Sequence, residues 1–392
     1  MREIIMEQIF YSESLNIIYD STSVKINGCQ VSEEDKGGMS SEAYAKQKMR
    51  QAYRDVISRQ YENVILLSGA GTSVGIGTNG KTGKTMAGLW SEVVKQVGFE
   101  TLKKFANAIK FAPIDEDYTD LEKLLSHAML SEAYRPRVRV SKMINKIEAI
   151  IRENCSLTLP DNAPHITLIR KITSRKLKYS RAKIFTLNYD LLFEQAASKG
   201  GYVVIDGFSF NMPREFSGVN FDYDIVTRSS NRAISEENFS PKVFHLYKIH
   251  GSLDWDRIQK GGLESFIKTD LPKCPVMIYP SNSKFESSYE QPYFEMISRF
   301  QQELRGKNTL LIVIGFSFYD KHIKAMIDEA LNVNPSITMI VVCPDVKNDR
   351  TYQDLKDKAE YMKNICLVCE DFENFVKYFP YSEIYDYTEG EN

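Results

Sequence analysis

The sequence predicts an α/β protein with a Rossmann-like open parallel sheet, a helical insertion and an N-terminal extension. The first observation is a series of short apolar runs of strand length, without alternation. The second is that amphipathic helical patterns separate several of these runs. Apolar runs joined through helices are typical of a parallel sheet covered on both faces. The runs lie at residues 64–67, 184–187, 202–205, 243–249, 276–279, 310–314, 337–342 and 365–368.

The segment before the first run differs in character. Residues 1–45 are polar and contain turn-forming pairs such as Asn27-Gly28, so we expect an extension that can serve as an oligomerisation arm. A helical pattern then leads directly into the first apolar run, where the core begins. We therefore expect a main domain at 46–380 and an acidic tail at 381–392.

Two stretches favour helices. Residues 90–180 show helical spacing of apolar residues and almost no strand pattern, which predicts a helical insertion. Between two late strands, residues 321–331 place five apolar residues on one helical face. These are Ile323, Met326, Ile327, Ala330 and Leu331.

Composition excludes several classes of protein. A chain of 392 residues that is 43% hydrophobic and 26% charged can bury a full-sized core. Its net charge of −2 creates no overall field for nucleic acid or an anionic membrane, so direct binding to either is not expected. The six cysteines are scattered and no basic-then-apolar leader opens the chain, which favours the cytoplasm. The longest apolar stretches fall short of the roughly 20 residues that a membrane helix needs.

Glycine or polar residues follow most of the apolar runs. In open α/β sheets, ligands bind outside the carboxyl ends of the strands, so these residues are the first candidates for a site. They are Gly69-Ala70-Gly71-Thr72-Ser73, Asn188-Tyr189-Asp190, His250-Gly251-Ser252, Gly315-Phe316-Ser317 and Cys343-Pro344-Asp345.

The loop at 69–73 favours a nucleotide. Glycines at 69 and 71 let backbone N–H groups approach a pyrophosphate, and Ser73 adds a hydroxyl at the start of a helix. A tight strand-to-helix turn without a ligand is the alternative.

Two further motifs overlap in the next segment. Residues 75–82, GIGTNGKT, satisfy the P-loop expression, and Gly75, Gly77 and Gly80 satisfy GxGxxG. Both motifs require the first glycine directly after the strand, whereas this strand ends about seven residues earlier. ATP hydrolysis is therefore disfavoured, and a mobile cover over the nucleotide is the simpler interpretation.

Asn188, Asp190 and His250 are the candidate catalytic residues. An amide can hold a ribose or a water, and a carboxylate can orient either, although both residue types also cap helices such as the one expected at 191–197. Strand alternation places His245 and His250 on opposite faces, which argues against a metal pair. His250 lies at the strand end, where it can reach a ligand or act as a structural histidine, and His245 is expected to be structural.

Together, four motifs resemble the sirtuin fold, in the order in which that family carries them. The resemblance spans roughly residues 62–345 and is strongest to prokaryotic sirtuin-like domains of antiphage defence. That group hydrolyses NAD and often works with a second protein such as a HerA-like ATPase. The motifs are Gly69 to Ser73, Thr186-Leu187-Asn188-Tyr189-Asp190, Lys248-Ile249-His250-Gly251-Ser252 and Ile314-Gly315-Phe316-Ser317.

The resemblance implies a role for each matched residue. Those expected to hold the pyrophosphate of NAD are Gly69, Ala70, Gly71 and Ser73, and Thr72 is a further expected NAD contact. Those expected around the nicotinamide ribose are Asn188, Asp190 and His250. The adenosine half would contact Gly315 and Ser317, and Asp345 is a further expected NAD contact.

The sequence departs from the sirtuin deacylases in two places. Those enzymes bind a structural zinc through two CxxC pairs, whereas this chain has only Cys366 and Cys369, whose odd separation places the thiols on opposite faces of a strand. No metal is therefore expected. The deacylase segment after the glycine loop is replaced here by residues 77–88, so deacylation is the weakest alternative.

The expected activity is hydrolysis of NAD to nicotinamide and ADP-ribose. The departing nicotinamide is already cationic in NAD, so the enzyme must position water and stabilise an oxocarbenium-like sugar. Asn188 is expected to position the water or ribose, Asp190 to support the positive charge, and His250 to act as a base.

Two other kinds of protein fit the same residues. The domain could sense NAD or ADP-ribose within an assembly without cleaving either, or the N-terminal and helical segments could build a homo-oligomeric scaffold for a partner. Because unregulated NAD hydrolysis harms the cell, we expect regulation by a partner, an oligomeric change or an infection signal.

Overall fold

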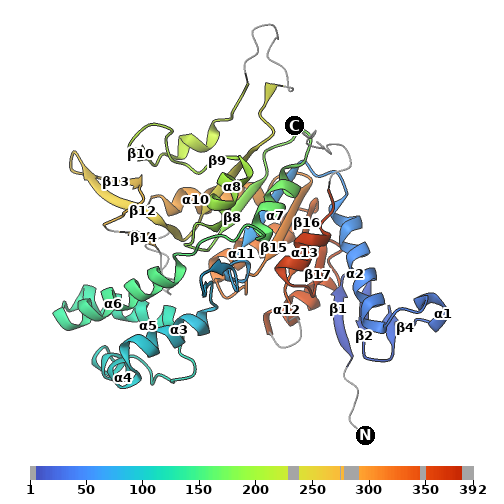
Figure 1. The fold of residues 1–392 in the computed structure, drawn as a ribbon, viewed down its shortest axis with the longest axis horizontal. Helices are drawn as coiled ribbons and strands as arrows, with labels where there is room; N and C mark the ends of the chain where they lie inside the picture. The colour runs from blue at the N-terminus through green and yellow to red at the C-terminus, as the bar shows by residue number, and fades with distance from the viewer. Residues whose placement is uncertain (1–5, 228–237, 274, 278–290, 345–349, 382–392) are drawn as a thin grey trace.

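The computed structural model describes residues 6–227, 238–273, 275–277, 291–344 and 350–381 (Figure 1). Within these residues, one large sheet runs through the middle of the molecule. Its strand order is β4-β3-β2-β1-β17-β16-β15-β5-β8-β11-β9. The mixed α/β architecture confirms the predicted Rossmann-like open sheet.

Seven neighbouring strands of this sheet are parallel to one another. They are, in spatial order, β17 (Ile365–Val368), β16 (Ile337–Val342), β15 (Thr309–Ile314), β5 (Asn63–Ser68), β8 (Lys183–Thr186), β11 (Val243–Lys248) and β9 (Val203–Ile205). Each contains one of the predicted apolar runs or most of it. The predicted run at 243–249 ends one residue early, because Ile249 and His250 form a turn.

Helices cover both faces of the parallel strands, as the uninterrupted apolar runs indicate. One face packs against α2 (Ser41–Ile57), α7 (Pro164–Thr173), α8 (Leu192–Gly200) and α13 (Phe372–Tyr378). The other face packs against α10 (Tyr293–Leu304), α11 (Lys321–Val333) and α12 (Arg350–Ala359). The predicted helix at 321–331 is α11, and four of its five apolar residues are buried.

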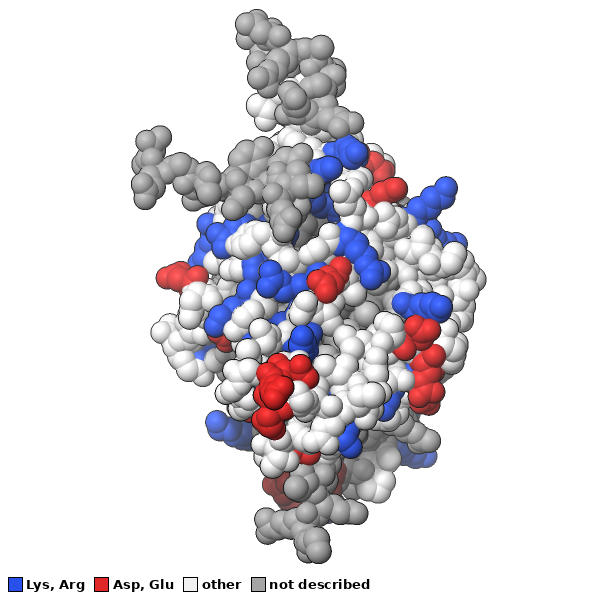
Figure 2. Space-filling view, turned by 90° about the vertical axis from the view of Figure 1, so that its right-hand side faces the viewer, with Lys and Arg blue, Asp and Glu red and all other residues white. Residues whose placement is uncertain are grey.

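The N-terminal segment continues the main sheet. Strand β1 (Glu7–Tyr11) pairs antiparallel with β17, and β2 (Asn16–Tyr19), β3 (Val24–Ile26) and β4 (Cys29–Gln30) follow as an antiparallel meander. A short helix α1 (Glu33–Lys36) then leads to α2. Figure 2 shows this side of the molecule, where basic and acidic side chains both occur.

A helical module lies beside the sheet (Figure 1). It consists of α3 (Met86–Val97), α4 (Phe99–Ala108), α5 (Leu121–Tyr134) and α6 (Val138–Cys155), which share a hydrophobic cluster of their own. Helix α7 also falls within the expected insertion at 90–180, but it packs on the core of the main sheet.

A second, antiparallel sheet has the order β10-β13-β12-β14. Its strands are β10 (Arg214–Glu215), β13 (Leu263–Lys268), β12 (Gly251–Lys260) and β14 (Pro275–Met277), and a short 3-10 turn, η2 (Gly218–Asp222), follows β10. The apolar run at 276–279 predicts a further strand of the parallel sheet. For residues 276 and 277 this prediction is wrong, because they belong to β14, which pairs antiparallel with β12. Residues 278 and 279 lie outside the described residues.

None of the helices in the described ranges combines the length and the apolar composition that crossing a membrane requires.

The burial of Ile17 tests whether the N-terminal strands belong to the main core. Ile17 in β2 is 0% exposed and packs in the cluster beneath α2. We expect Ile17→Ala to lower the free energy of unfolding by about 2–5 kcal/mol. The matched control is Ile18→Ala on the half-buried opposite face of the same strand, which should cost clearly less. Equal shifts of the denaturation midpoint for both variants would contradict this packing.

Candidate active site

The topological switch point of the sheet lies between β5 and β15. From β5 the chain builds β8, β9 and β11 on one side and then returns to build β15, β16 and β17 on the other. The loops that leave two such neighbouring strands in opposite directions form a crevice at their carboxyl ends. The predicted loops at 69–73 and 315–317 meet at this place.

The two loops pack main chain against main chain. The N–H of Gly69 donates to the carbonyl of Ile314 (3.0 Å), and the N–H of Gly71 donates to the carbonyl of Gly315 (3.0 Å). A Cβ on Gly69 would lie 2.5 Å from the Gly315 oxygen, and one on Gly71 would lie 2.5 Å from the Gly315 Cα. Gly315 itself has φ +64°, which favours glycine.

This packing revises the reason for the glycines. We expected the N–H groups of Gly69 and Gly71 to approach a pyrophosphate, but both donate within the protein. The loop forms a short 3-10 turn, η1 (Ala70–Thr72), in which Ala70 and Gly71 are exposed. Ala70 and Gly71 are therefore the residues of this turn that a ligand can reach.

A polar network joins this loop to the end of β8. The Asn188 side-chain amide donates to the Gly69 carbonyl (3.0 Å), the Thr72 hydroxyl (3.1 Å) and the Ser73 hydroxyl (2.8 Å). Ser73 in turn donates to the Asp190 carboxylate (2.6 Å). The structure thus brings together the predicted residues of the glycine loop with Asn188 and Asp190.

Asp190 combines the two roles that its position suggested. Its Oδ1 accepts the N–H of Leu192 at the start of α8, while its Oδ2 accepts the Ser73 hydroxyl. The side chain is buried, and burial raises the pKa of the carboxyl above its usual range, although Lys248 and the Ser73 hydroxyl oppose this rise. Asp190 therefore takes up a proton more readily than a surface aspartate does.

His250 lies in the turn between β11 and β12. It is 7% exposed, and its Nε2 lies 3.1 Å from the Asp320 carboxylate. The other oxygen of Asp320 accepts the N–H groups of His322 and Ile323 and caps α11. Asp320 was not among the predicted site residues. It comes directly before the helix predicted at 321–331, and an aspartate at that position is a typical helix cap.

His245, which was expected to be structural, lies within β11 and is buried. Its Nδ1 lies 3.1 Å from the Tyr247 hydroxyl. Burial, together with the nearby cation of Lys183, lowers the pKa of His245 to about 4.

The remaining predicted NAD contacts have different outcomes. Gly315 lies against Gly71 of the glycine loop, and Ser317 is exposed on the same loop as Gly315. A contact of either with adenosine stays a prediction. Asp345 lies outside the described residues.

The P-loop and GxGxxG matches belong to a β-hairpin. Strands β6 (Gly77–Thr78) and β7 (Lys81–Thr82) pair antiparallel, and both residues between them, Asn79 and Gly80, have positive φ. Two such residues form the turn that tight hairpins prefer, so the glycines serve the hairpin and not a phosphate. The hairpin is anchored beside the glycine loop, because Gly83 lies directly against the Ser73 carbonyl.

The two cysteines at the C-terminal strand have separate environments. Cys366 is buried under the α2 face, and burial raises the pKa of its thiol to about 11. The Cys369 thiol donates to the Pro344 carbonyl (3.2 Å). Across the described ranges, no three or more His, Cys, Asp or Glu side chains form a group that could hold a metal ion.

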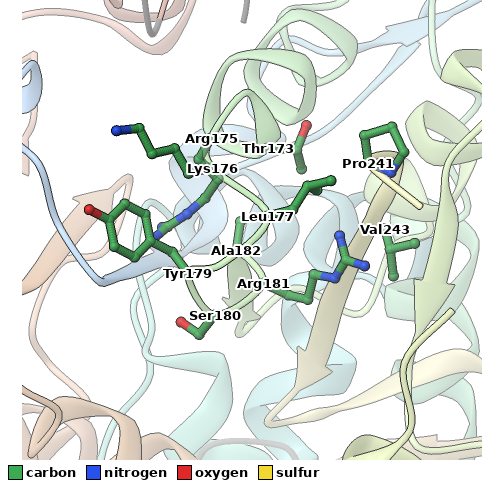
Figure 3. A pocket seen from close by; sticks show the side chains of 10 residues that line it. All are labelled: Thr173, Arg175, Lys176, Leu177, Tyr179, Ser180, Arg181, Ala182, Pro241 and Val243. Carbon is green, nitrogen blue, oxygen red and sulfur yellow. The ribbon is translucent and has the colours of Figure 1, made fainter. Parts of the chain in front are cut away.

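A shallow pocket elsewhere in the molecule lies at the opposite, amino-terminal ends of β8 and β11 (Figure 3). Two of the arginines that line it contact the protein. Arg181 pairs with Asp224, and Arg175 donates to the carbonyls of Tyr61 and Glu62. It brings together none of the predicted site residues.

The contact between the loops predicts that Gly71 tolerates no side chain. Gly71→Ala should lower the free energy of unfolding by about 1–3 kcal/mol, because the new Cβ overlaps main-chain atoms that cannot rotate away. The control is Gly88→Ala in α3, where the nearest atoms belong to the side chains of Lys84 and Thr85. Thermal unfolding compares the two. A Gly71→Ala protein as stable as the control would show that the loops are not in contact.

Comparison with known proteins adds one match. The family model of the SIR2-like domain matches residues 182–365. No curated protein matches the chain. The matched segment contains Asn188, Asp190, His250 and the loop after β15, while the glycine loop precedes it. SIR2-like domains bind NAD, so the match supports the sirtuin-like family and an activity related to NAD.

Proposed function

We propose that the protein binds NAD at the β5–β15 crevice and hydrolyses the bond between nicotinamide and ribose. The observation that carries the proposal is the network in which Asn188 and Asp190 meet Ser73 of the glycine loop. The SIR2-like match over residues 182–365 supports NAD as the ligand.

The proposed orientation of NAD rests on the resemblance to sirtuins. The pyrophosphate would lie against Ala70 and Gly71, and the adenosine half would lie toward Gly315 and Ser317. The nicotinamide ribose would then point toward the polar network and His250. This order is the one that the resemblance to sirtuins implies.

The chemistry requires little acid catalysis. A water adds to C1′ of the ribose while the C1′–N bond breaks. The electron pair of that bond leaves with nicotinamide and neutralises its positive charge. Asn188 would orient the water or the ribose, and the Asp190 carboxylate would stabilise the positive charge on the sugar. His250 would accept the water proton, with Asp320 holding its ring in place.

The biological setting is proposed from the resemblance. Depletion of NAD in antiphage defence would require control of the enzyme, and a homo-oligomer or a HerA-like ATPase partner would provide it. The N-terminal strands and the helical module lie at the margins of the main sheet (Figure 1) and are the expected places for such contacts.

The catalytic assignment is tested with Asn188→Ala and His250→Ala. Each variant should keep its secondary structure and lose about 10²- to 10⁴-fold in NAD turnover, because each removes a group that acts on the reacting ribose or water. Release of nicotinamide, with any activating partner present, measures the loss. Undiminished turnover in either variant would remove that residue from the mechanism. Tight NAD binding without release by the wild type would favour the sensing module.

The raised pKa of Asp190 predicts the acid limit of activity. If its carboxylate must be ionised, turnover should fall as the pH drops through a pKa above the usual aspartate range. Asp190→Asn should have low turnover and should lack this acid limb. The measurement is kcat/KM against pH for both proteins. An acid limb that persists unchanged in Asp190→Asn would assign the titration to another group.

A further inference from the structure

Lys248 is a buried cation at the end of β11, two residues before His250. Its side chain is 2% exposed, and it is among the largest fully buried side chains of the described residues. An ammonium group is costly to bury unless several acceptors surround it. The partners of Lys248 therefore indicate what it holds in place.

Those partners connect three parts of the candidate site. The Lys248 ammonium donates to the main-chain carbonyls of Tyr189 (3.2 Å) and Asp190, and it pairs with Glu194 of α8 (3.1 Å). The two carbonyls belong to the segment that carries Asn188 and Asp190. One side chain thus links the end of β11, the loop after β8 and the first turn of α8.

Neighbouring contacts strengthen this link. The Tyr189 carbonyl also accepts the N–H of Leu253 from β12, so the loop after β8 is held from two sides. The charges nearby are balanced by a second cation, because Lys268 pairs with Asp206 (2.8 Å) and Asp254 (3.3 Å). Lys248 also acts on the Asp190 carboxyl directly, since its charge opposes the effect of burial on that pKa.

We infer that Lys248 is a positioning residue, which fixes Asn188 and Asp190 relative to His250 for the cleavage of NAD. The inference rests on the proposed function for its catalytic consequence. The physical basis of the inference is the position of Lys248 at the end of β11, two residues before His250. From there it donates to the main-chain carbonyls of Tyr189 and Asp190. A displacement of about 1 Å between catalytic groups can lower a rate about 10²-fold.

The chain offers a matched pair for comparison. Lys183 lies at the amino end of β8 and pairs with Glu303 of α10 (2.8 Å), so it is also a largely buried Lys–Glu pair on the same sheet. It lies at the opposite end of the strand from the loop that carries Asn188. A purely structural role would make the two pairs equivalent.

The experiment compares Lys248→Met/Glu194→Met with Lys183→Met/Glu303→Met in the full chain. Both members of each pair are replaced, because removal of the lysine alone would leave a buried carboxylate without its cation. Thermal unfolding establishes that both double variants fold. Nicotinamide release then gives kcat and KM, and deuterium uptake by residues 187–192 reports the order of the loop.

The expected result is a fall in kcat of at least about tenfold for the Lys248 pair, with KM changed less than about threefold. Deuterium uptake at 187–192 should rise at least about tenfold in that variant only. Unchanged uptake, or equal effects of the two pairs on kcat and uptake, would overturn the inference. If the wild type releases no nicotinamide with any activating partner present, the proposed function fails, while uptake still decides the positioning role of Lys248. If the Lys248 pair fails to fold, Lys248→Gln/Glu194→Gln replaces it in the same comparison, and unchanged uptake there overturns the inference equally.

Discussion

Two main-chain segments approach each other at the carboxyl edge of the sheet so closely that only glycine fits between them. Gly69 and Gly71 after β5 lie against Gly315 after β15, and a Cβ on any of the three would overlap the opposing backbone. Contact of this kind cannot be adjusted by rotating a side chain. The position of Ser73, and with it the whole polar network after β8, depends on this contact.

The groups proposed to act on NAD also hold the structure together. Asp190 accepts the N–H of Leu192 at the start of α8 and the hydroxyl of Ser73, while Asp320 caps α11 and contacts His250. Hydrogen bonds from N–H groups at the starts of these helices hold both short side chains in fixed positions. The cost is burial, which raises the pKa of Asp190 and makes its charge depend on Lys248. Replacement of either aspartate is therefore expected to lower stability as well as to affect the proposed chemistry.

The parallel half of the sheet could be predicted because its strands are apolar on both faces. The N-terminal strands could not, since they are short and only partly buried, and the long strand β12 ends in exposed polar residues. At the site, Ser73, Asn188 and Asp190 could be predicted because each closely follows an apolar run that predicts a strand, and ligands bind at the carboxyl ends of such strands. The roles of Asp320 and Lys248 could not be predicted in this way, because they depend on contacts with residues distant in the chain. Asp320 contacts His250, 70 positions away, and Lys248 contacts Asp190, 58 positions away.

The most direct measurement is a crystal structure of the His250→Ala protein with NAD, in which the dinucleotide would be preserved. We predict that the pyrophosphate lies against Ala70 and Gly71, at the carboxyl ends of β5 and β15. We also predict the nicotinamide ribose within hydrogen-bond distance of the Asn188 amide. NAD bound away from this crevice, or bound with its adenosine end at Asn188, would contradict the account.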